Sequence, residues 1–268
     1  MADPILVAEG LTKTFGKSLF SGRPASQRPA LDNVSLTLER GEILGIVGES
    51  GSGKTTLGRC IACLEAPDSG RVLLGGEDLL KLKARSLRTV RRRIQMIFQD
   101  PFASLNPRLR VGDAIAEVLR VHRLADAGVI PGRIGTLLAQ VGLPPSAADA
   151  YPSAFSGGQR QRISIARALA AEPEILIADE PVSSLDVSIQ AQVINLLLDL
   201  RDRLGLSILF IGHDLPLIDF IAPRKIVMFG GKVVETLAAG ASLAEAQHPY
   251  TRELISAVPD IDRLVERS

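Results

Sequence analysis

Residues 48–55 read Gly48-Glu49-Ser50-Gly51-Ser52-Gly53-Lys54-Thr55 and fit the pattern G-x-x-x-x-G-K-[ST]. The run Ile43–Val47 before them is apolar, as in a strand covered on both faces, and Lys54–Leu64 after them has the pattern of a helix. A strand, a glycine-rich loop and a helix in this order indicate a P-loop, whose backbone N–H groups and helix N-terminus bind phosphate. In such a loop Lys54 meets the β- and γ-phosphates, and the Thr55 hydroxyl reaches Mg²⁺. A glycine-rich turn with a chance Lys-Thr is the weaker alternative, because strand and helix are both in place.

A second apolar stretch, Ile175–Ala178, leads directly into Asp179 and Glu180. An acid at the C-terminal end of a strand is how a P-loop fold holds Mg²⁺, usually through water, and Asp179 fits that role. Glu180 follows at once and could polarise an attacking water as a general base. An ordinary acidic strand end would be a fair competitor without the P-loop. Together the two elements predict a nucleotide hydrolase.

The rest of the chain alternates strand patterns with helix patterns. The predicted strands are 5–9, 34–39, 43–47, 72–74, 94–98, 175–178, 207–211 and 226–229, and the predicted helices are 54–64, 86–93, 111–143, 159–171 and 189–204, followed by a helical end from residue 242. This alternation, with buried strands, predicts an α/β fold around a parallel sheet. The helical pattern over 111–143 interrupts this alternation of strands and helices and predicts a helical subdomain in the middle of the chain.

Composition narrows the class of protein. The chain has 268 residues, 46% of them hydrophobic, and a net charge of +1, which argues against broad nucleic-acid binding because that needs a basic excess. No stretch reaches the ~18 uninterrupted apolar residues of a membrane span, and the start lacks the features of a secretory signal, so we expect a soluble chain. Cys60 and Cys63 form a C-x-x-C pair without a second pair to complete a zinc site. We expect two small buried helix residues in a reducing cytoplasm.

A third motif, Phe155-Ser156-Gly157-Gly158-Gln159, precedes a predicted helix that starts near Arg160. A serine and two glycines at a helix start can bind a phosphate in the same way as the P-loop. Two phosphate-binding segments in one chain suggest that two chains share one nucleotide.

With these three motifs the sequence resembles the ATP-binding-cassette (ABC) family. Residues 155–159 are similar to the family signature L-S-G-G-Q, with phenylalanine in place of leucine. Other positions fit family motifs in the family's order, namely the adenine-stacking aromatic Phe15, the glutamine loop at Gln99, the dimer-contact loop Ser184-Leu185-Asp186 and the switch histidine His213. Alone, Phe15 could be a core residue, Gln99 a loop residue and His213 a structural histidine. Their joint order favours the functional interpretation.

The resemblance implies a set of site residues for ATP and Mg²⁺. The nucleotide-binding residues would be Phe15, Gly48, Glu49, Ser50, Gly51, Ser52, Gly53, Lys54, Thr55, Thr56, Ser156, Gly157, Gly158, Gln159 and Asp186. The catalytic residues would be Glu180, His213 and Gln99, and the metal ligands would be Thr55, Gln99 and Asp179.

It also implies an architecture and partners. The fold would be a P-loop NTPase of ABC type, with a RecA-like core, an N-terminal antiparallel β subdomain and an inserted helical subdomain at about 100–165. The ATPase domain would span 1–240, followed by a short extension at 241–268. The chain would pair with a second ATPase subunit and two transmembrane permease subunits at the cytoplasmic face of the inner membrane, with an external solute-binding protein as an indirect partner and no nucleic acid.

Within the family, two stretches resemble the oligopeptide/dipeptide/nickel importers: Gln99-Asp100-Pro101 with Ser104–Arg108, and His248–Leu254. The loop between Gly16 and Pro29 resembles an insertion in one of the two ATPase subunits of such importers. The other subunit type often has a C-terminal cysteine cluster, which this chain lacks. The resemblance therefore implies the second subunit type beside a non-identical ATPase partner, although an identical partner stays open, and the sequence does not name the solute.

Other functions are open at this point. A soluble ABC ATPase of DNA repair or translation is the main alternative, but zinc cysteines, long coiled coils and a second cassette are not visible. An ABC exporter subunit is the second, and the importer-like stretches argue against it. A small-molecule kinase with a P-loop would have no use for residues 156–159.

Overall fold

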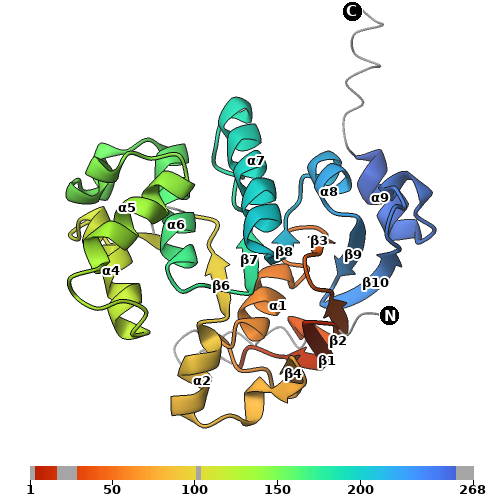
Figure 1. Cartoon of the computed structure of the whole chain (residues 1–268). Coiled ribbons are helices and arrows are strands. Elements are labelled where there is room, and N and C mark those ends of the chain that lie inside the picture. The colour runs from red at the N-terminus through yellow and green to blue at the C-terminus, as the bar shows by residue number, and fades with distance from the viewer. Residues whose placement is uncertain (1–3, 17–28, 101–103, 258–268) are drawn as a thin grey trace, which may run out of the picture.

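The computed structural model describes residues 4–16, 29–100 and 104–257 and contains two β-sheets, the larger of which has helices on both faces (Figure 1). The strands are β1 (Leu6–Lys13), β2 (Leu31–Leu38), β3 (Ile43–Val47), β4 (Ser69–Leu74), β5 (Glu77–Asp78), β6 (Ile94–Ile97), β7 (Ile175–Asp179), β8 (Ser207–Ile211), β9 (Arg224–Phe229) and β10 (Lys232–Leu237). The helices are α1 (Lys54–Ile61), α2 (Ala84–Arg91), α4 (Val111–Val121), α5 (Ile130–Gln140), α6 (Gly157–Leu169), α7 (Val187–Leu204), α8 (Leu215–Ile221) and α9 (Pro249–Ser256).

The larger sheet has six strands in the order β10-β9-β3-β8-β7-β6. Its members β9, β3, β8, β7 and β6 pair in parallel, and β10 joins the edge antiparallel to β9. Every residue of β3, β7 and β8 is buried, which explains why these strands read as continuous apolar runs in the sequence. The chain segments that follow β3, β8, β7 and β6 therefore emerge side by side at one edge of the sheet.

Successive side chains of these strands point to opposite faces and build two cores. One face, with Ile43, Ile208 and Phe210, packs against α7, α8 and the helical block. The other face, with Leu44 and Leu209, packs against α1 and the smaller sheet, an antiparallel sheet in the order β2-β1-β4-β5.

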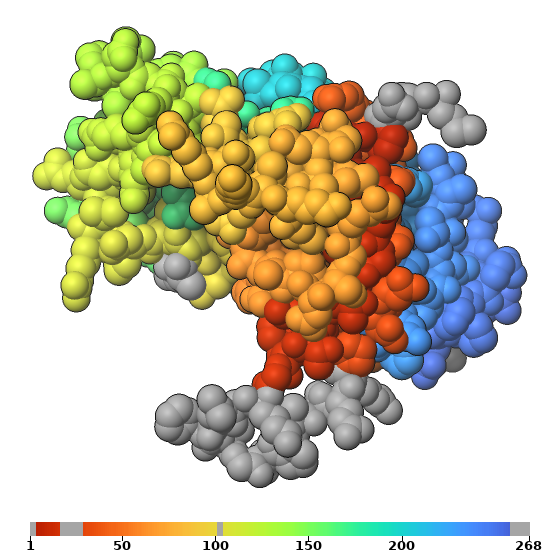
Figure 2. Space-filling model, turned by 90° about the horizontal axis from the view of Figure 1, so that it is seen from below, coloured from red at the N-terminus to blue at the C-terminus, as the bar shows by residue number. Residues whose placement is uncertain are grey.

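The helical block consists of α4, α5 and α6 and stands beside the β6 edge of the large sheet, at the left of Figure 1. Figure 2 shows the molecule from below, with this block at one end, the C-terminal elements at the other, and α2 with the antiparallel sheet between them. Within the described ranges, no helix combines the length and the apolar composition that crossing a bilayer requires.

The α/β fold with an antiparallel sheet and a helical block, expected from the sequence, is confirmed. β3 and β8 have the predicted bounds. The helix-like segment predicted over 111–143 contains two helices, since α4 ends at Val121 and α5 begins at Ile130. Three of these elements were not predicted, the two-residue strand β5, the edge strand β10 and the short helix α8.

The cysteines are both buried and free, as expected. Cys60 lies in α1, but Cys63 lies beyond its end with a left-handed φ of 54°, so the prediction of two helix residues is wrong for Cys63. Burial raises the pKa of each thiol to about 11, which keeps both neutral near pH 7.

Candidate functional site

The loop of residues 48–53 connects β3 to α1 and depends on glycine at both ends. Gly48 has φ 150°, and a Cβ there would lie 2.2 Å from the Met228 carbonyl oxygen. Gly53 caps α1 with φ 104°, and a Cβ there would lie 2.3 Å from the Ala30 carbonyl oxygen. Neighbouring backbone thus leaves no space for a side chain, and the loop can curl in front of the first turn of α1 as a phosphate-binding loop requires.

Lys54 is a buried ammonium group held by backbone carbonyls. Its Nζ donates to the carbonyl oxygens of Gly48 and Glu49 at 2.7 and 2.8 Å, and lies 3.4 Å from the Ser52 hydroxyl. Burial lowers the pKa of Lys54, and the nearby carboxylates of Glu180 and Asp179 partly oppose that shift. A cation that is satisfied mainly by neutral acceptors is suited to bind an incoming anion, because an ion pair is stronger than its bonds to carbonyls.

Thr55 and Asp179 meet across the gap between α1 and β7. The Thr55 hydroxyl donates to Oδ1 of Asp179 at 3.1 Å. Burial raises the pKa of Asp179, and the Thr55 bond and the positive charges of Arg59 and Lys54 act in the opposite direction. A hydroxyl oxygen and a carboxylate oxygen held together match the all-oxygen ligands that Mg²⁺ prefers, so these residues fit the ion expected from the sequence.

Glu180 follows β7 and is held by contacts from two neighbouring strands. Its Oε2 accepts from Gln99 Nε2 at 2.8 Å and lies 3.2 Å from His213 Nδ1. Gln99 follows β6 and His213 follows β8, the two strands on either side of β7. The structure therefore places Gln99 beside Glu180, the expected base.

The backbone of Glu180 is in the left-handed region, at φ 46°. Its N–H donates to the Ile211 carbonyl at 2.9 Å, and its own carbonyl accepts from the N–H and the hydroxyl of Ser183. A non-glycine residue in this region costs of order 1–3 kcal/mol, and such strain concentrates at functional sites.

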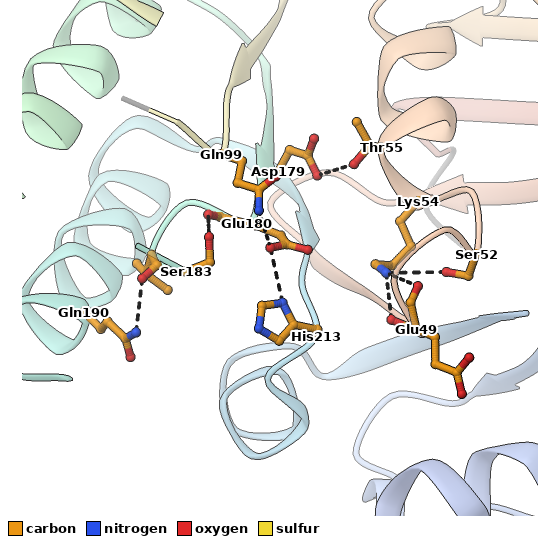
Figure 3. A network of polar contacts seen from close by, with 12 residues as sticks. Glu49, Ser52, Lys54, Thr55, Gln99, Asp179, Glu180, Ser183, Gln190 and His213 are labelled. Atoms are coloured by element: carbon orange, nitrogen blue, oxygen red, sulfur yellow. Dashed lines mark hydrogen bonds and ion pairs between the residues drawn. The ribbon is translucent and has the colours of Figure 1, made fainter. Parts of the chain in front are cut away.

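These side chains surround one open cavity of about 650 Å³. Figure 3 shows Lys54 and Thr55 on one side of it and Gln99, Asp179, Glu180 and His213 on the other. The residues that line the cavity are Ala30, Ser50, Gly51, Gly53, Lys54, Thr55, Thr56, Gln99, Glu180 and His213. Most of the residues expected to act on the γ-phosphate are thus together within a single chain.

The signature segment does not line this cavity. Ser156 is the N-cap of α6 and forms a capping box with Gln159, in which each side chain bonds the other residue's backbone N–H. α6 belongs to the helical block, apart from α1 in Figure 1. Asp186 is the exposed N-cap of α7, and Phe15 is 53% exposed with the Lys13 ammonium 5.4 Å from its ring centroid.

Two contacts at the site were not foreseen from the sequence. Gly158 packs on α7, and a Cβ there would lie 2.3 Å from Cγ2 of Ile189, so this glycine has a packing role inside the chain. Tyr250 accepts a hydrogen bond from the Glu49 N–H at 3.0 Å, across 201 residues of sequence. No local pattern signals a contact at such separation. Three stretches that the sequence analysis names lie outside the described residues, namely the loop between Gly16 and Pro29, Pro101, and the end of the chain after residue 257.

Comparisons with known proteins identify the family of this chain. A family model described as ABC transporter matches residues 31–183. The chain is 49% identical to a Brucella ovis protein with the provisional name peptide import ATP-binding protein, over 97% of this chain and 80% of that protein. It is 51% identical to the oligopeptide transport ATP-binding protein OppF of Streptococcus mutans, over 92% of this chain and 81% of that protein.

Solved structures give the same result. The ATP-binding cassette MJ0796, a dimer in a post-hydrolysis state with ADP and Pi, has a TM-score of 0.76 and 29% identity, covering 88% of this chain and 99% of that chain. The cbiO1 protein of Clostridium perfringens, part of the transporter complex cbiONQ, also has a TM-score of 0.76, with 26% identity, covering 98% of this chain and 99% of that chain.

Proposed function

This chain belongs to the ABC transporter family, and from that premise we propose that it is the ATP-hydrolysing subunit of an importer for peptides. The observation that carries the proposal is the single cavity in which a P-loop lysine faces Glu180, Gln99 and His213. The Brucella ovis relative is named as a peptide import ATP-binding protein and the Streptococcus mutans relative as an oligopeptide transport ATP-binding protein, which favours import over export and over a role in DNA repair or translation.

Phosphate binding is assigned to the loop and the start of α1. The backbone N–H groups of the loop and the N-terminus of α1 are donors for the β-phosphate, and Lys54 exchanges its carbonyl partners for phosphate oxygens. Ser50, Gly51 and Thr56 line the same cavity and belong to this set. Phe15, 53% exposed, is assigned to the adenine ring, for which an accessible aromatic face is suitable.

The hydrolytic step is assigned to Glu180. A water oxygen forms a bond to the γ-phosphorus, the bond from that phosphorus to the β–γ bridging oxygen breaks, and ADP leaves with this oxygen. Glu180 accepts the proton of the water. Gln99 and His213 both reach Oε2, so within the described residues Oε1 keeps its lone pairs for the water. His213, with a side chain 61% exposed, is the group positioned to contact the γ-phosphate.

Thr55 and Asp179 are assigned to the metal, with Gln99 as a further ligand. Bound Mg²⁺ would neutralise charge on the β- and γ-phosphates. The 3.1 Å contact of Thr55 with Asp179 supports this pair. Gln99 contacts Glu180 through its amide nitrogen, and its amide oxygen would be the atom that binds the metal.

We place the signature segment Ser156–Gln159 and Asp186 at an interface with a second ATPase subunit. The segment lies outside the chain's own cavity, and the related cassette MJ0796 is a dimer. ATP bound between a P-loop and a partner's signature favours the closed dimer because it contacts both subunits only there. A decisive shift needs about 5 kcal/mol, which two or three charge-assisted hydrogen bonds of ~1.5–3 kcal/mol provide.

Further parts of the proposal concern the assembly. The ATPase domain covers 1–240, with a helical subdomain at about 100–165 and an extension at 241–268. The partner ATPase is a different subunit, two permease subunits receive the motion, and the chain is peripheral at the cytoplasmic face of the inner membrane.

The Glu180→Gln variant tests the proposal. Glutamine keeps the size and the contacts of the side chain but does not accept the proton, so ATP binding persists while phosphate release falls by ~10²-fold or more. Mixed with the partner ATPase subunit, this variant should be held by MgATP as a dimer in size-exclusion chromatography.

The control is Glu172→Gln, which changes an acid outside the cavity that pairs with Arg133. It should release phosphate at the parent rate. Turnover of Glu180→Gln near that of the parent would remove Glu180 as the base.

A further inference from the structure

Tyr250 connects the C-terminal helix to the P-loop. It is the second residue of α9, it is 8% exposed, and its hydroxyl accepts the Glu49 N–H at 3.0 Å. The bond joins the first peptide of the loop to an element that lies outside both the P-loop and the catalytic strand ends.

The Gly48–Glu49 peptide group is held at both of its polar atoms. Its N–H, from Glu49, donates to Tyr250 at 3.0 Å, and its carbonyl, from Gly48, accepts from Lys54 Nζ at 2.7 Å. Rotation of this peptide about the chain axis breaks both bonds. The tyrosine hydroxyl therefore fixes the carbonyl that positions the ammonium group of Lys54.

The hydroxyl of Tyr250 is fixed by contacts that do not involve the P-loop. The ring of Tyr250 lies on that of Phe229, with centroids 4.2 Å apart, and the backbone N–H of Tyr250 donates to His248 Nδ1 at 3.2 Å. The N–H groups of Gln247 and His248 both donate to Oε1 of Glu235 on β10, at 2.6 and 3.2 Å. Phe229 is also next to Met228, whose carbonyl packs against Gly48, so one short stretch of β9 supports both sides of the contact.

We propose that Tyr250 is a positioning residue for ATP binding, which keeps the Gly48–Glu49 peptide in the orientation that presents Lys54 to the phosphates. This role rests on the proposed function of the cavity. Without the hydroxyl, the Gly48–Glu49 peptide turns away in a fraction of the molecules, and those molecules no longer bind ATP well. The apparent affinity for ATP then falls in proportion to the fraction that keeps the binding orientation. The base and its partners, Glu180, Gln99 and His213, are untouched by that change.

The test is Tyr250→Phe, which keeps the ring on Phe229 and removes only the acceptor. Loss of one hydrogen bond corresponds to about a three- to ten-fold rise in the Kd of a fluorescent ATP analogue with Mg²⁺, and in KM for ATP. We expect kcat to remain within about two-fold. A merely structural role would lower the active fraction, and so kcat, with Kd and KM unchanged.

The other tyrosine provides a matched control. Tyr151 is 46% exposed beside Arg110, and Tyr151→Phe should leave Kd and KM at parent values. Hydrogen exchange of the Glu49 amide gives a readout besides activity, and it should become faster in Tyr250→Phe. If that variant does not fold, Phe229→Leu, which loosens the ring but keeps the hydroxyl, should raise Kd in the same direction.

The outcomes separate the two proposals. Unchanged Kd and unchanged amide exchange in Tyr250→Phe, with a parent that binds ATP, overturn the positioning role alone. A parent chain that binds no nucleotide overturns the proposed function and the positioning role together.

Discussion

The charged side chains at the centre of the site are held by different kinds of group, backbone carbonyls for Lys54 and two side chains for Glu180. Lys54 bonds two carbonyls of its own loop, and Glu180 is contacted from the strands on either side. The residue types and their order were predictable because the P-loop pattern is local. The partners of each side chain were not, since Gln99 and Glu180 are 81 residues apart.

At this scale the ion pair of Glu174 with Arg93 gives a pH prediction. Both Arg93 Nε and Nη2 bond the carboxylate, Nη2 at 3.1 Å, and this bonding lowers the pKa of Glu174. As acid is added, Glu174 therefore takes up its proton in the unfolded chain before it does so in the folded chain. The pair stabilises the fold at pH values above the unfolded pKa of about 4.3, and this stabilisation is lost as the pH falls through the folded pKa. Glu174→Gln should therefore lower Tm relative to the parent most near neutral pH and least in acid.

Thermal unfolding of parent and variant at a series of pH values checks this. Arg93→Gln, which removes the other partner, should show the same pH-dependent difference. A Tm difference that stays constant down to pH 3.5 contradicts the assignment.

Elements buried in the sheet were predicted better than elements at its periphery. β3 and β8 are buried on both faces, so their apolar runs end where the strands end. β10 lies at the sheet edge and is only partly buried, so it lacks such a run, and α8 has seven residues, too few to establish a helical period. The contact of Gly158 with α7 was missed because a glycine carries no sign of what packs against it.

The packing of α6 on α7 leads to a prediction at this scale. Gly158→Ala should destabilise the chain by ~1–3 kcal/mol, because the new Cβ would lie 2.3 Å from Cγ2 of Ile189, a β-branched residue with little freedom to rotate. Urea unfolding measures the effect. Loss of ATPase activity in this variant therefore does not by itself report on phosphate binding.

Gly132→Ala is the matched control, because Gly132 lies in α5 with nothing within 4 Å of its Cβ position. It should stabilise the chain by ~0.5–1 kcal/mol. Addition of Ile189→Ala to Gly158→Ala should cost less than the sum of the two single changes. Additive costs would show that the two side chains do not collide.

On the scale of the whole molecule, residues 156–159 lie outside the chain's own nucleotide cavity, and this arrangement has a testable consequence. Ser156→Ala should leave the affinity of the single chain for MgATP close to that of the parent. In the Glu180→Gln background it should abolish the dimer that MgATP otherwise holds, because the partner's nucleotide loses a donor.

Ser242→Ala is the control for the loss of a capping serine, since Ser242 forms the capping box of a short turn before α9. It should keep the dimer. A dimer that forms equally well with Ser156→Ala at the same MgATP concentration would argue against a shared site.

The order of strands in the large sheet fixes the spacing of the catalytic groups. The strands β3, β8, β7 and β6 are consecutive neighbours in this sheet. The P-loop follows β3, His213 follows β8, Asp179 ends β7 with Glu180 directly after it, and Gln99 follows β6. Neighbouring strands lie ~4.8 Å apart, so the ends of these four strands span roughly 14 Å. Hydrogen bonds between the strands keep that distance constant. On the proposed function, a movement of the helical block against the large sheet would leave these spacings unchanged, because the block contributes none of the four strands.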